Sequence, residues 1–413
     1  MLLFIFLIVL CLAMILFYLH FHIENFTPSI STVIENDIAT TTLVNNGIGK
    51  KAQHLTIYTN EYLSDYFIYI NLLQRNDNKH TIIVLDSQFN IVDEFGNNPG
   101  TCIQVYKDYL YVGGPSNLLR YTIDPLTGLV TNKESPDLII RGFQSTRISD
   151  SPIFIINPQT NALYFHLQSP TNSCQMNSQD RKQAPGEIPC TRLRNNSCVW
   201  VFDAMKLNQT LDMGILYSIG IRKMRSLVIY NNKLYGITQG RDSLFELYPQ
   251  YYTQEQGNEL APDELIKIDQ NTNFGFPYCY WDSSISKRVL APEYGGNGTE
   301  QAHCNSLIDK PIEIFSSHNG PNDLLIHNSR MYIAWNGKPY PLKCDKSCAT
   351  LSVSFFNLDN QNEEMKLTDK GVLVQFNSSH KTKPSGLTAC PDNSILITDS
   401  LTGKIWKSVL KEK

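Results

Sequence analysis

The chain has 413 residues, of which 42% are hydrophobic and 18% are charged, and this balance excludes a disordered chain or a fibre. The formal net charge of −4 and the pI near 6.1 give no reason to expect a nucleic-acid partner. An aromatic content of 11%, together with frequent Val, Ile and Thr, favours β structure.

The first segment, Met1–Leu19, is apolar and carries no charged side chain. As an α-helix it would span roughly 29 Å, about the thickness of a bilayer core. No basic residue precedes it, and bulky side chains from Tyr18 to His22 follow where a signal peptidase needs small ones. We therefore predict that residues 1–22 form an uncleaved transmembrane anchor. The Lys/Arg asymmetry that normally sets orientation is missing.

Residues 23–54 are polar, rich in Thr, Ser and Asn, and without a steady hydrophobic period. They predict a stalk or a leader strand. From residue 55 to residue 413 no linker rich in Pro, Gly or Ser interrupts the chain, which favours one domain. A unit of that length is large for a single hydrophobic core unless its architecture is repetitive.

Short hairpins recur along this unit. An apolar strand, a polar turn and a second apolar strand with a Leu-Tyr-like pair appear five times, and a looser sixth copy precedes them. The five copies span residues 103–114, 154–167, 227–238, 324–335 and 387–399, and the looser copy spans 81–95. Small sheets bury both faces only when they stack around a common axis. The predicted fold is therefore all-β, a six-bladed β-propeller over residues 55–413.

Cysteines and glycosylation motifs indicate a secretory lumen or the cell exterior for most of the chain. Nine cysteines follow the apolar run, and an oxidising compartment would pair up to eight of them. Five Asn-x-Ser/Thr motifs predict glycosylation. They begin at Asn25, Asn195, Asn208, Asn297 and Asn377. We expect a single-pass membrane glycoprotein with disulfides and a lumenal or extracellular propeller.

Four blocks of the sequence resemble the glucose/sorbosone dehydrogenase family. The blocks are YLYVGGPSNLLRYTIDPLTGLVTNKE (109–134), SIGIRKMRSLVIYNNKLYGITQGRD (218–242), APDELIKIDQNTNFGFPYCYWD (261–282) and KPSGLTACPDNSILITDSLTGKIWKSV (383–409). Together they cover most of residues 100–410. The resemblance implies a six-bladed propeller that uses pyrroloquinoline quinone (PQQ) to oxidise an alcohol or lactol carbon of a sugar. The expected ligand is therefore a sugar or another carbohydrate.

The same resemblance assigns residues to the cofactors. Ca²⁺, held partly by main-chain carbonyls, maps to Gly240 and Arg241, and such ligands suit a hard cation. A cationic side chain over the quinone maps to Arg222, whose planar guanidinium can stack and neutralise carboxylates. Lys223 stands where the family has Asn, and Lys383 takes the place of a basic residue near the last blade. The alternative for Arg222 is an ordinary salt bridge at the surface or between blades.

The chain departs from the family at the catalytic base. A family segment like Gly-Gly-His-Ser-Thr-Arg supplies a His, whereas residues 142–147 read Gly-Phe-Gln-Ser-Thr-Arg and place Gln144 there. A carboxamide cannot accept a proton near neutral pH, and losing a positioned base costs about 10²–10⁴ in rate. His318 matches a His of sorbosone-type members and is a second catalytic candidate. For Asp263 and Glu264 we favour loop capping or blade packing over catalysis.

Two functions follow from this pattern. The first is a membrane-anchored, PQQ- and Ca²⁺-dependent sugar dehydrogenase with an altered base. The second is a propeller that has lost catalysis and binds a carbohydrate or protein partner, because function depends on the site rather than on the fold. Gln144 favours the second function, whereas Arg222 and Gly240 favour the first. A hydrolase or a nicotinamide enzyme lacks support, since no Gly-x-Ser-x-Gly or Gly-x-Gly-x-x-Gly motif stands in the required context.

Overall fold

The structure is a computed structural model. It describes residues 32–49, 51–73, 81–96, 99–145, 151–175, 183–299, 304, 310–337, 351–359, 363–377 and 379–411. The chain divides into two compact units, Met1–Val33 and Ile34–Lys413. The predicted anchor at residues 1–22 and the motif at Asn25 lie outside the described residues. Among the residues that are described, no helix combines the length and the apolar character needed to cross a bilayer.

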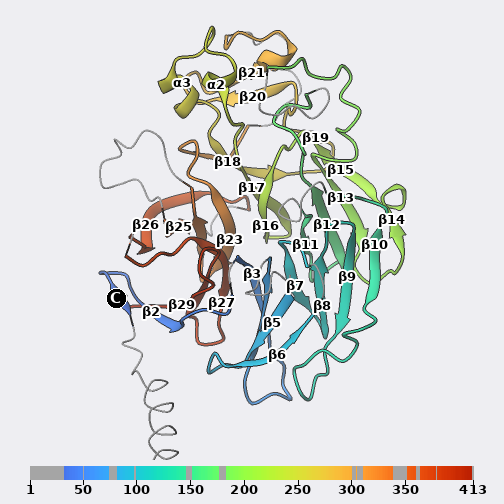
Figure 1. The fold of residues 1–413 in the computed structure, drawn as a ribbon, viewed down its shortest axis with the longest axis vertical. Helices are drawn as coiled ribbons and strands as arrows, with labels where there is room; N and C mark the ends of the chain where they lie inside the picture. The colour runs from blue at the N-terminus through green and yellow to red at the C-terminus, as the bar shows by residue number, and fades with distance from the viewer. Residues whose placement is uncertain are drawn as a thin grey trace, which may run out of the picture. The chain divides into compact units, whose positions relative to one another are not determined.

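Six sheets of four main strands build the second unit, and we number them as blades 1 to 6 in chain order (Figure 1). Blade 1 contains β3 (Ala52–Tyr58), β4 (Phe67–Leu72), β5 (Thr81–Leu85) and β6 (Ile91–Phe95). Blade 2 contains β7 (Ile103–Tyr106), β8 (Tyr109–Gly113), β9 (Asn117–Thr122) and β10 (Asp137–Arg141). Blade 3 contains β11 (Ile153–Ile156), β12 (Ala162–Leu167), β13 (Cys198–Asp203) and β15 (Ile215–Ile219).

The second half repeats the pattern. Blade 4 contains β16 (Met224–Tyr230), β17 (Lys233–Thr238), β18 (Asp263–Ile268) and β22 (Glu313–Phe315). Blade 5 contains β23 (Pro321–His327), β24 (Arg330–Trp335), β25 (Ser352–Leu358) and β26 (Leu367–Gln375). Blade 6 contains β27 (Pro384–Ala389), β28 (Ile395–Asp399), β29 (Ile405–Leu410) and, from the start of the chain, β2 (Ala39–Asn45), with β1 (Val33–Glu35) beside it.

Shorter elements decorate the blades. The strands β14 (Gln209–Thr210) and β19 (Thr272–Asn273) add in parallel to the outer edges of blades 2 and 3, and η3 (Leu211–Met213) follows β14. An insertion in blade 4 contains α2 (Leu244–Leu247), α3 (Gln254–Glu259), the hairpin of β20 (Cys279–Asp282) and β21 (Lys287–Leu290), and η4 (Pro292–Tyr294). Figure 1 shows α2, α3 and this hairpin grouped together at the top of the view, beyond one end of β17 and β18.

Turn chemistry explains the register of two inner hairpins. In blade 4, Asn231 and Asn232 join β16 to β17 with φ of 48° and 59°. In blade 5, Asn328 and Ser329 join β23 to β24 with φ of 48° and 57°. Two-residue turns with positive φ at both positions match the right-handed twist of paired strands, and Asn adopts this conformation readily. These turns fix which side chains of each hairpin face the neighbouring blades.

Apolar side chains close the ring by packing between successive blades. One buried cluster joins blades 1 and 2, another joins blades 2, 3 and 4, and three more join blades 4 and 5, 5 and 6, and 6 and 1. Strand β2 completes the closure, since it pairs antiparallel with β29 from Ala39↔Leu410 to Asn45↔Ile405. The predicted all-β six-bladed propeller is therefore confirmed.

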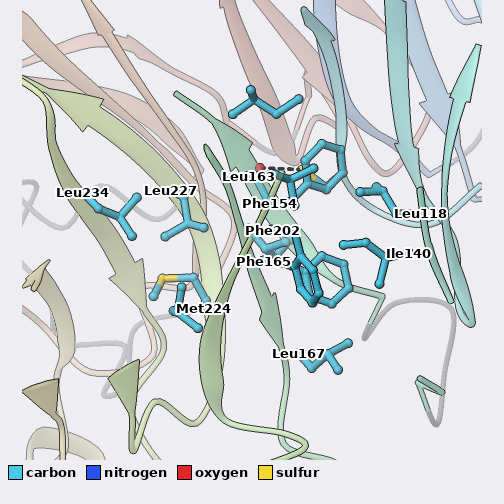
Figure 2. Packing of buried hydrophobic residues seen from close by; sticks show 14 of the residues in the cluster. Leu118, Ile140, Phe154, Leu163, Phe165, Leu167, Phe202, Met224, Leu227 and Leu234 are labelled. Carbon is cyan, nitrogen blue, oxygen red and sulfur yellow. Dashed lines mark hydrogen bonds between the residues drawn. The ribbon is translucent and has the colours of Figure 1, made fainter. Parts of the chain in front are cut away.

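Figure 2 shows the largest of these clusters at close range. Phe165 of β12 and Phe202 of β13 meet edge to face with ring centroids 5.9 Å apart. Side chains of blade 2, such as Leu118 and Ile140, approach them from one side, and Met224 of blade 4 approaches from the other. Blade 3 thus contributes apolar side chains to both neighbours, as the propeller architecture requires.

Five of the six hairpins predicted from the repeats are the two inner strands of blades 2 to 6. The looser copy at residues 81–95 also forms the predicted hairpin, and its strands β5 and β6 are the two outer strands of blade 1. The inner pair of that blade is β3 and β4, which are separated by a long polar connection. That connection hides the hairpin pattern. Residues 39–45, inside the segment predicted as a stalk or leader strand, form β2.

Among the described residues, two disulfides form, as predicted. They join Cys174 to Cys190 and Cys279 to Cys304. Glu187 lies near the first bond, but both sulfurs there are already bonded to each other. Among the described residues, the free cysteines are Cys102, Cys198 and Cys390, and all three are buried. Cys344 and Cys348 lie outside the described residues.

A buried histidine joins blades 3 and 4. His166 of β12 places Nδ1 3.0 Å from the Cys198 carbonyl oxygen, and the Met224 amide donates to its Nε2 at 3.3 Å. Since Nε2 accepts, Nδ1 carries the proton of the neutral ring. Burial lowers the pKa of His166 to about 3.

This histidine predicts acid sensitivity. Below about pH 6.5, His166 is protonated in the unfolded chain but stays neutral in the folded chain, so the free energy of unfolding falls as the pH falls. One such group gives a slope of about 1.4 kcal/mol per pH unit. Urea unfolding between pH 7.5 and pH 5 measures it. The variant His166→Gln is expected to have a shallower slope than the wild type, and equal slopes would refute the assignment.

Candidate functional site

Three loops meet at one end of blades 4 and 5. The first is residues 220–223, which lead into β16, and the second is residues 239–242, which follow β17. Because β16 and β17 are antiparallel partners with Met224 opposite Thr238, these two loops leave the sheet at the same end. The third loop, residues 316–320, leads into the next inner strand, β23. This geometry brings together residues that lie up to about 100 positions apart in the sequence.

The first contact in this group is an ion pair. Arg222 Nη2 lies 2.7 Å from Asp242 Oδ2, and Arg222 Nη1 donates to the Gly240 carbonyl oxygen. The Arg222 side chain is only 13% exposed, whereas that of Asp242 is 46% exposed. Arg222 therefore forms a salt bridge within blade 4, and its partner belongs to the loop that the resemblance assigns to the cofactors.

His318 completes the group from the third loop. Its Nδ1 lies 3.9 Å from Asp242 Oδ1, and its side chain is 28% exposed. The backbone of His318 is left-handed, with φ of 63°. A non-glycine residue pays a conformational cost there, and such costs concentrate at functional sites. His318, Asp242 and Arg222 therefore form one connected polar cluster, which we call the Arg222–Asp242–His318 group.

Two side chains hold the loops in place. Asp263, at the start of β18, accepts the Gly240 amide at 3.0 Å and the Gly320 amide at 3.1 Å, so it ties the second loop to the third. Asn172 of blade 3 accepts the Asp242 amide at 3.0 Å and donates to the Asp242 carbonyl at 2.7 Å. The Asp242 main chain is therefore held on both sides, which orients its carboxylate.

Burial and charge shift the acidic groups in opposite directions. Burial raises the pKa of the Asp263 carboxyl to about 7, against the lowering effect of its two amide hydrogen bonds. Burial also acts to raise the pKa of Asp242, but the charge and hydrogen bond of Arg222 outweigh it and hold that pKa below its usual value. The charges of His318 and Lys223 lower it further. Asp242 is consequently an anion at neutral pH.

The Arg241 side chain turns away from the group into the blade 4 insertion. It forms a two-pronged ion pair with Glu293, with both contacts at 3.0 Å, and both side chains are almost fully buried. A second buried pair joins Arg288 to Glu264 at 2.8 and 2.6 Å. Glu264 thus packs within the blade, as expected, and Asp263 caps loops. The Arg241 pair fixes the backbone that follows Gly240.

The other predicted site residues are Gln144, Lys223 and Lys383. Gln144 is exposed on the loop after β10. The Lys223 carbonyl accepts the Gln239 amide at 2.9 Å, which joins the first two loops. Lys383 is exposed, and its amide donates to Asp399 at 2.7 Å. The structure thus brings Arg222, Gly240 and His318 together.

Sequence reasoning missed Asp242, Asn172 and Glu293. The signal for Asp242 was present, because it directly follows Gly240 and Arg241 in the Gly-Arg-Asp motif. Asn172 comes from another blade, and Glu293 lies about 50 positions from its partner in a loop-rich insertion. No short-range pattern in the sequence connects these residues to the site.

The donor chemistry at the group fits an anionic quinone with Ca²⁺. The Gly240 carbonyl, which keeps a second lone pair beside the Arg222 contact, and the Asp242 carboxylate are hard oxygen ligands of the kind Ca²⁺ prefers. Arg222 supplies a cation for carboxylates. Gln168 directly precedes Ser169, whose amide donates to the Arg222 carbonyl. Gln168 is 3% exposed, and neither of its side-chain polar atoms has a partner among the described residues. An orphaned amide of this kind suits a polar ligand.

These features define a class of protein, the six-bladed β-propellers. More narrowly, the chain belongs to the TrAA12-like family, whose family model matches residues 65–406. This family and the solved structures below fit the sugar dehydrogenase family that the sequence resembles. No curated protein sequence matches the chain.

Solved structures share the fold at low sequence identity. The Trichoderma reesei carbohydrate-active enzyme of family AA12 has 13% identity and a TM-score of 0.70, covering 93% of this chain and 98% of that one. The holo PQQ domain of pyranose dehydrogenase from Coprinopsis cinerea has 14% identity and a TM-score of 0.67, covering 92% and 97%. The soluble aldose sugar dehydrogenase of Escherichia coli has 10% identity and a TM-score of 0.58, covering 92% and 100%.

Proposed function

We propose that the protein is a PQQ-dependent sugar dehydrogenase whose cofactor is assisted by Ca²⁺. The observation that carries this proposal is the Arg222–Asp242–His318 group beside the Gly240 carbonyl. It combines a cation, hard oxygen ligands and a titratable ring in one cluster. The similar propellers support it, since one is described as the holo form of a PQQ domain and another as a calcium structure.

The roles follow from the contacts. When bound, the quinone would accept a hydride from a hydroxyl-bearing carbon of the sugar. Arg222, with Lys223 and Lys383, would hold its carboxylates, and the Gly240 and Arg241 carbonyls would hold the cation. His318 faces Asp242 with Nδ1, which leaves Nε2 to take the sugar hydroxyl proton. The 3.9 Å separation is long for a hydrogen bond, but catalytic hydrogen bonds commonly tighten only when substrate is present.

Replacing Arg222 tests the cofactor assignment. Arg222→Ala is expected to weaken PQQ binding about 10–100-fold, because it removes charge-assisted hydrogen bonds to a carboxylate. Arg222→Lys keeps the positive charge but not the planar guanidinium that binds a carboxylate through two nitrogens, so it should lower the PQQ affinity by an intermediate amount. The measurement is titration of the Ca²⁺-loaded protein with PQQ by quinone absorbance. Arg141→Ala, at an exposed arginine that ends β10, is the matched control. Unchanged affinity in Arg222→Ala would remove the assigned role.

The second function, a propeller that binds a carbohydrate or protein partner without catalysis, is favoured by Gln144. Dye reduction with a panel of sugars after loading with PQQ and Ca²⁺ separates the two. Turnover supports the dehydrogenase, and absence of quinone binding at micromolar PQQ supports the binding module. If the quinone binds without turnover and Gln144→His creates turnover, the missing base at that position is the defect.

We also propose that the propeller is lumenal or extracellular, anchored by residues 1–22. The four described Asn-x-Ser/Thr motifs all present an exposed asparagine, as transfer of a glycan requires. At one of them Thr299 Oγ1 donates to Asn297 Oδ1 at 2.8 Å. Expression in a secretory host should give a membrane-bound protein whose mass falls on glycosidase treatment. A soluble product without glycans would contradict the proposal.

A further inference from the structure

A cavity of about 50 Å³ lies where the first two site loops meet the hairpin of β20 and β21. Much of its wall is apolar, with aromatic side chains such as Phe274 and Phe276. Its charged lining residues are Arg222, Arg241, Arg288 and Glu264. Each of these arginines pairs with a carboxylate, so the balance of charge alone does not identify a ligand.

Two of the arginines keep one N–H group without an acceptor. Arg241 donates to Glu293 from both of its terminal nitrogens, and Arg288 donates to Glu264 in the same way. The Nε atoms of Arg241 and Arg288 are buried and have no partner in the described part of the chain. Because a guanidinium does not lose its proton in a protein, each Nε remains a hydrogen-bond donor.

Trp281 adds a third donor of the same kind. It lies opposite Arg288 in the pairing of β20 with β21, so the two side chains share one face of the hairpin. The Arg288 guanidinium lies 5.4 Å from the centroid of the indole ring. That contact uses the face of the ring, whereas the Nε1–H group lies in its plane. Trp281 Nε1 is buried and has no partner among the residues that the structure describes.

The three side chains are deeply buried. Trp281 and Arg241 are each 7% exposed, and Arg288 is 6% exposed. A buried donor that finds no acceptor is costly, and native proteins rarely leave such groups unsatisfied. Three buried donors on the wall of one cavity therefore indicate a ligand that accepts hydrogen bonds.

We propose that this cavity binds one small monovalent anion, with chloride as the physiological ligand, through Arg241 Nε, Arg288 Nε and Trp281 Nε1. Chloride accepts several hydrogen bonds and donates none, whereas a water molecule must also find acceptors for its own two protons. Two of the donors belong to cations, and hydrogen bonds from charged donors to an anion are the stronger kind. The volume suffices, because one water molecule needs only about 10–15 Å³ on this measure.

The anion would join the second site loop to the blade 4 insertion. Arg241 belongs to the loop at residues 239–242, whereas Trp281 and Arg288 belong to the hairpin. Binding to the folded chain alone would stabilise it, as any such ligand does. None of the three side-chain donors takes part in the proposed sugar oxidation, so this site is independent of that function.

Thermal unfolding of the full-length protein, without PQQ or Ca²⁺, tests the proposal. The Tm is measured in NaCl and in sodium gluconate at equal ionic strength, so that screening of surface charges is the same in both salts. Gluconate is too large for the cavity. The Tm should rise with chloride concentration and reach saturation in the millimolar range, and NaBr should act in the same way. Equal Tm values in chloride and gluconate overturn the proposal.

Trp281→Phe tests the donor set without breaking either ion pair. It removes the Nε1–H group and keeps an aromatic ring on the cavity wall. The chloride affinity, obtained from the dependence of Tm on chloride, should fall about 10–100-fold. Trp200→Phe is the matched control, because Trp200 Nε1 is also buried without a described partner but does not line this cavity. An unchanged chloride dependence in Trp281→Phe overturns the assignment.

Crystals grown in NaBr give a second and direct measurement. The anomalous signal of bromide should appear in the cavity, within hydrogen-bonding reach of Arg241 Nε, Arg288 Nε and Trp281 Nε1. Ordered water at that position in place of bromide overturns the proposal. Sugar oxidation is not measured in any of these experiments, so their outcome is separate from that of the dehydrogenase assignment.

Discussion

The variant His318→Gln is expected to lower kcat for sugar oxidation by about 10²–10⁴-fold, the range that a positioned general base contributes. His318 is the titratable ring of the Arg222–Asp242–His318 group, and Gln144 has no basicity to offer in its place. KM should change little, because glutamine keeps a hydrogen-bonding side chain of similar size. The rise of kcat/KM with pH that reports an ionising base should disappear in the variant.

Two comparisons give this prediction its meaning. His380→Gln removes a half-buried imidazole of blade 6 that packs against Trp406, and it should leave kcat unchanged. Gln144→Ala should also leave kcat within a few-fold of the wild type. If instead Gln144→Ala abolishes turnover and His318→Gln does not, the reaction depends on the loop after β10 and the role given to His318 is wrong.

The fold was predictable from the sequence wherever the chain folds on itself locally. Hairpins such as β16–β17 have apolar strands on both sides of an Asn-Asn turn, so pattern and turn chemistry agree. The inner pair of blade 1 lacks such a turn, and the repeat was therefore assigned to β5 and β6. The pairing of β2 with β29 joins residues more than 350 positions apart, and no local pattern encodes it.

The sequence predicted several residues of the site but not the contacts between them. The Gly-Arg-Asp motif pointed to Gly240 and Arg241, yet the sequence did not show that Arg241 turns away into the insertion while Asp242 meets Arg222. Those directions are set by Glu293 and by Asn172, which reach the loop from other elements. Contacts between residues this far apart depend on how the blades pack, and that packing cannot be predicted from a single sequence.

Among the variants considered, breaking the buried Arg241–Glu293 ion pair is expected to lower the free energy of unfolding most. Glu293→Leu would leave the Arg241 guanidinium buried and uncompensated, and breaking a buried pair in this way typically costs about 3–5 kcal/mol. Arg241 also lies over the Tyr280 ring at 5.5 Å, but a cation–π contact of about 0.5–2 kcal/mol does not replace the lost carboxylate. Urea unfolding of the variant and the wild type measures the loss. Glu364→Gln, at an exposed ion pair with Lys267, is the control and should change stability little.

The double variant Arg241→Met with Glu293→Leu separates the charge from the packing. If the cost of Glu293→Leu comes from the buried positive charge, removing Arg241 as well should restore most of the stability, because apolar replacements of similar volume are often neutral for such pairs. A double variant as unstable as Glu293→Leu alone would contradict this account. PQQ affinity gives an independent reading, since Arg241 fixes the backbone after Gly240. A stable double variant that binds the quinone weakly would show that the ion pair serves to position the carbonyls of this loop.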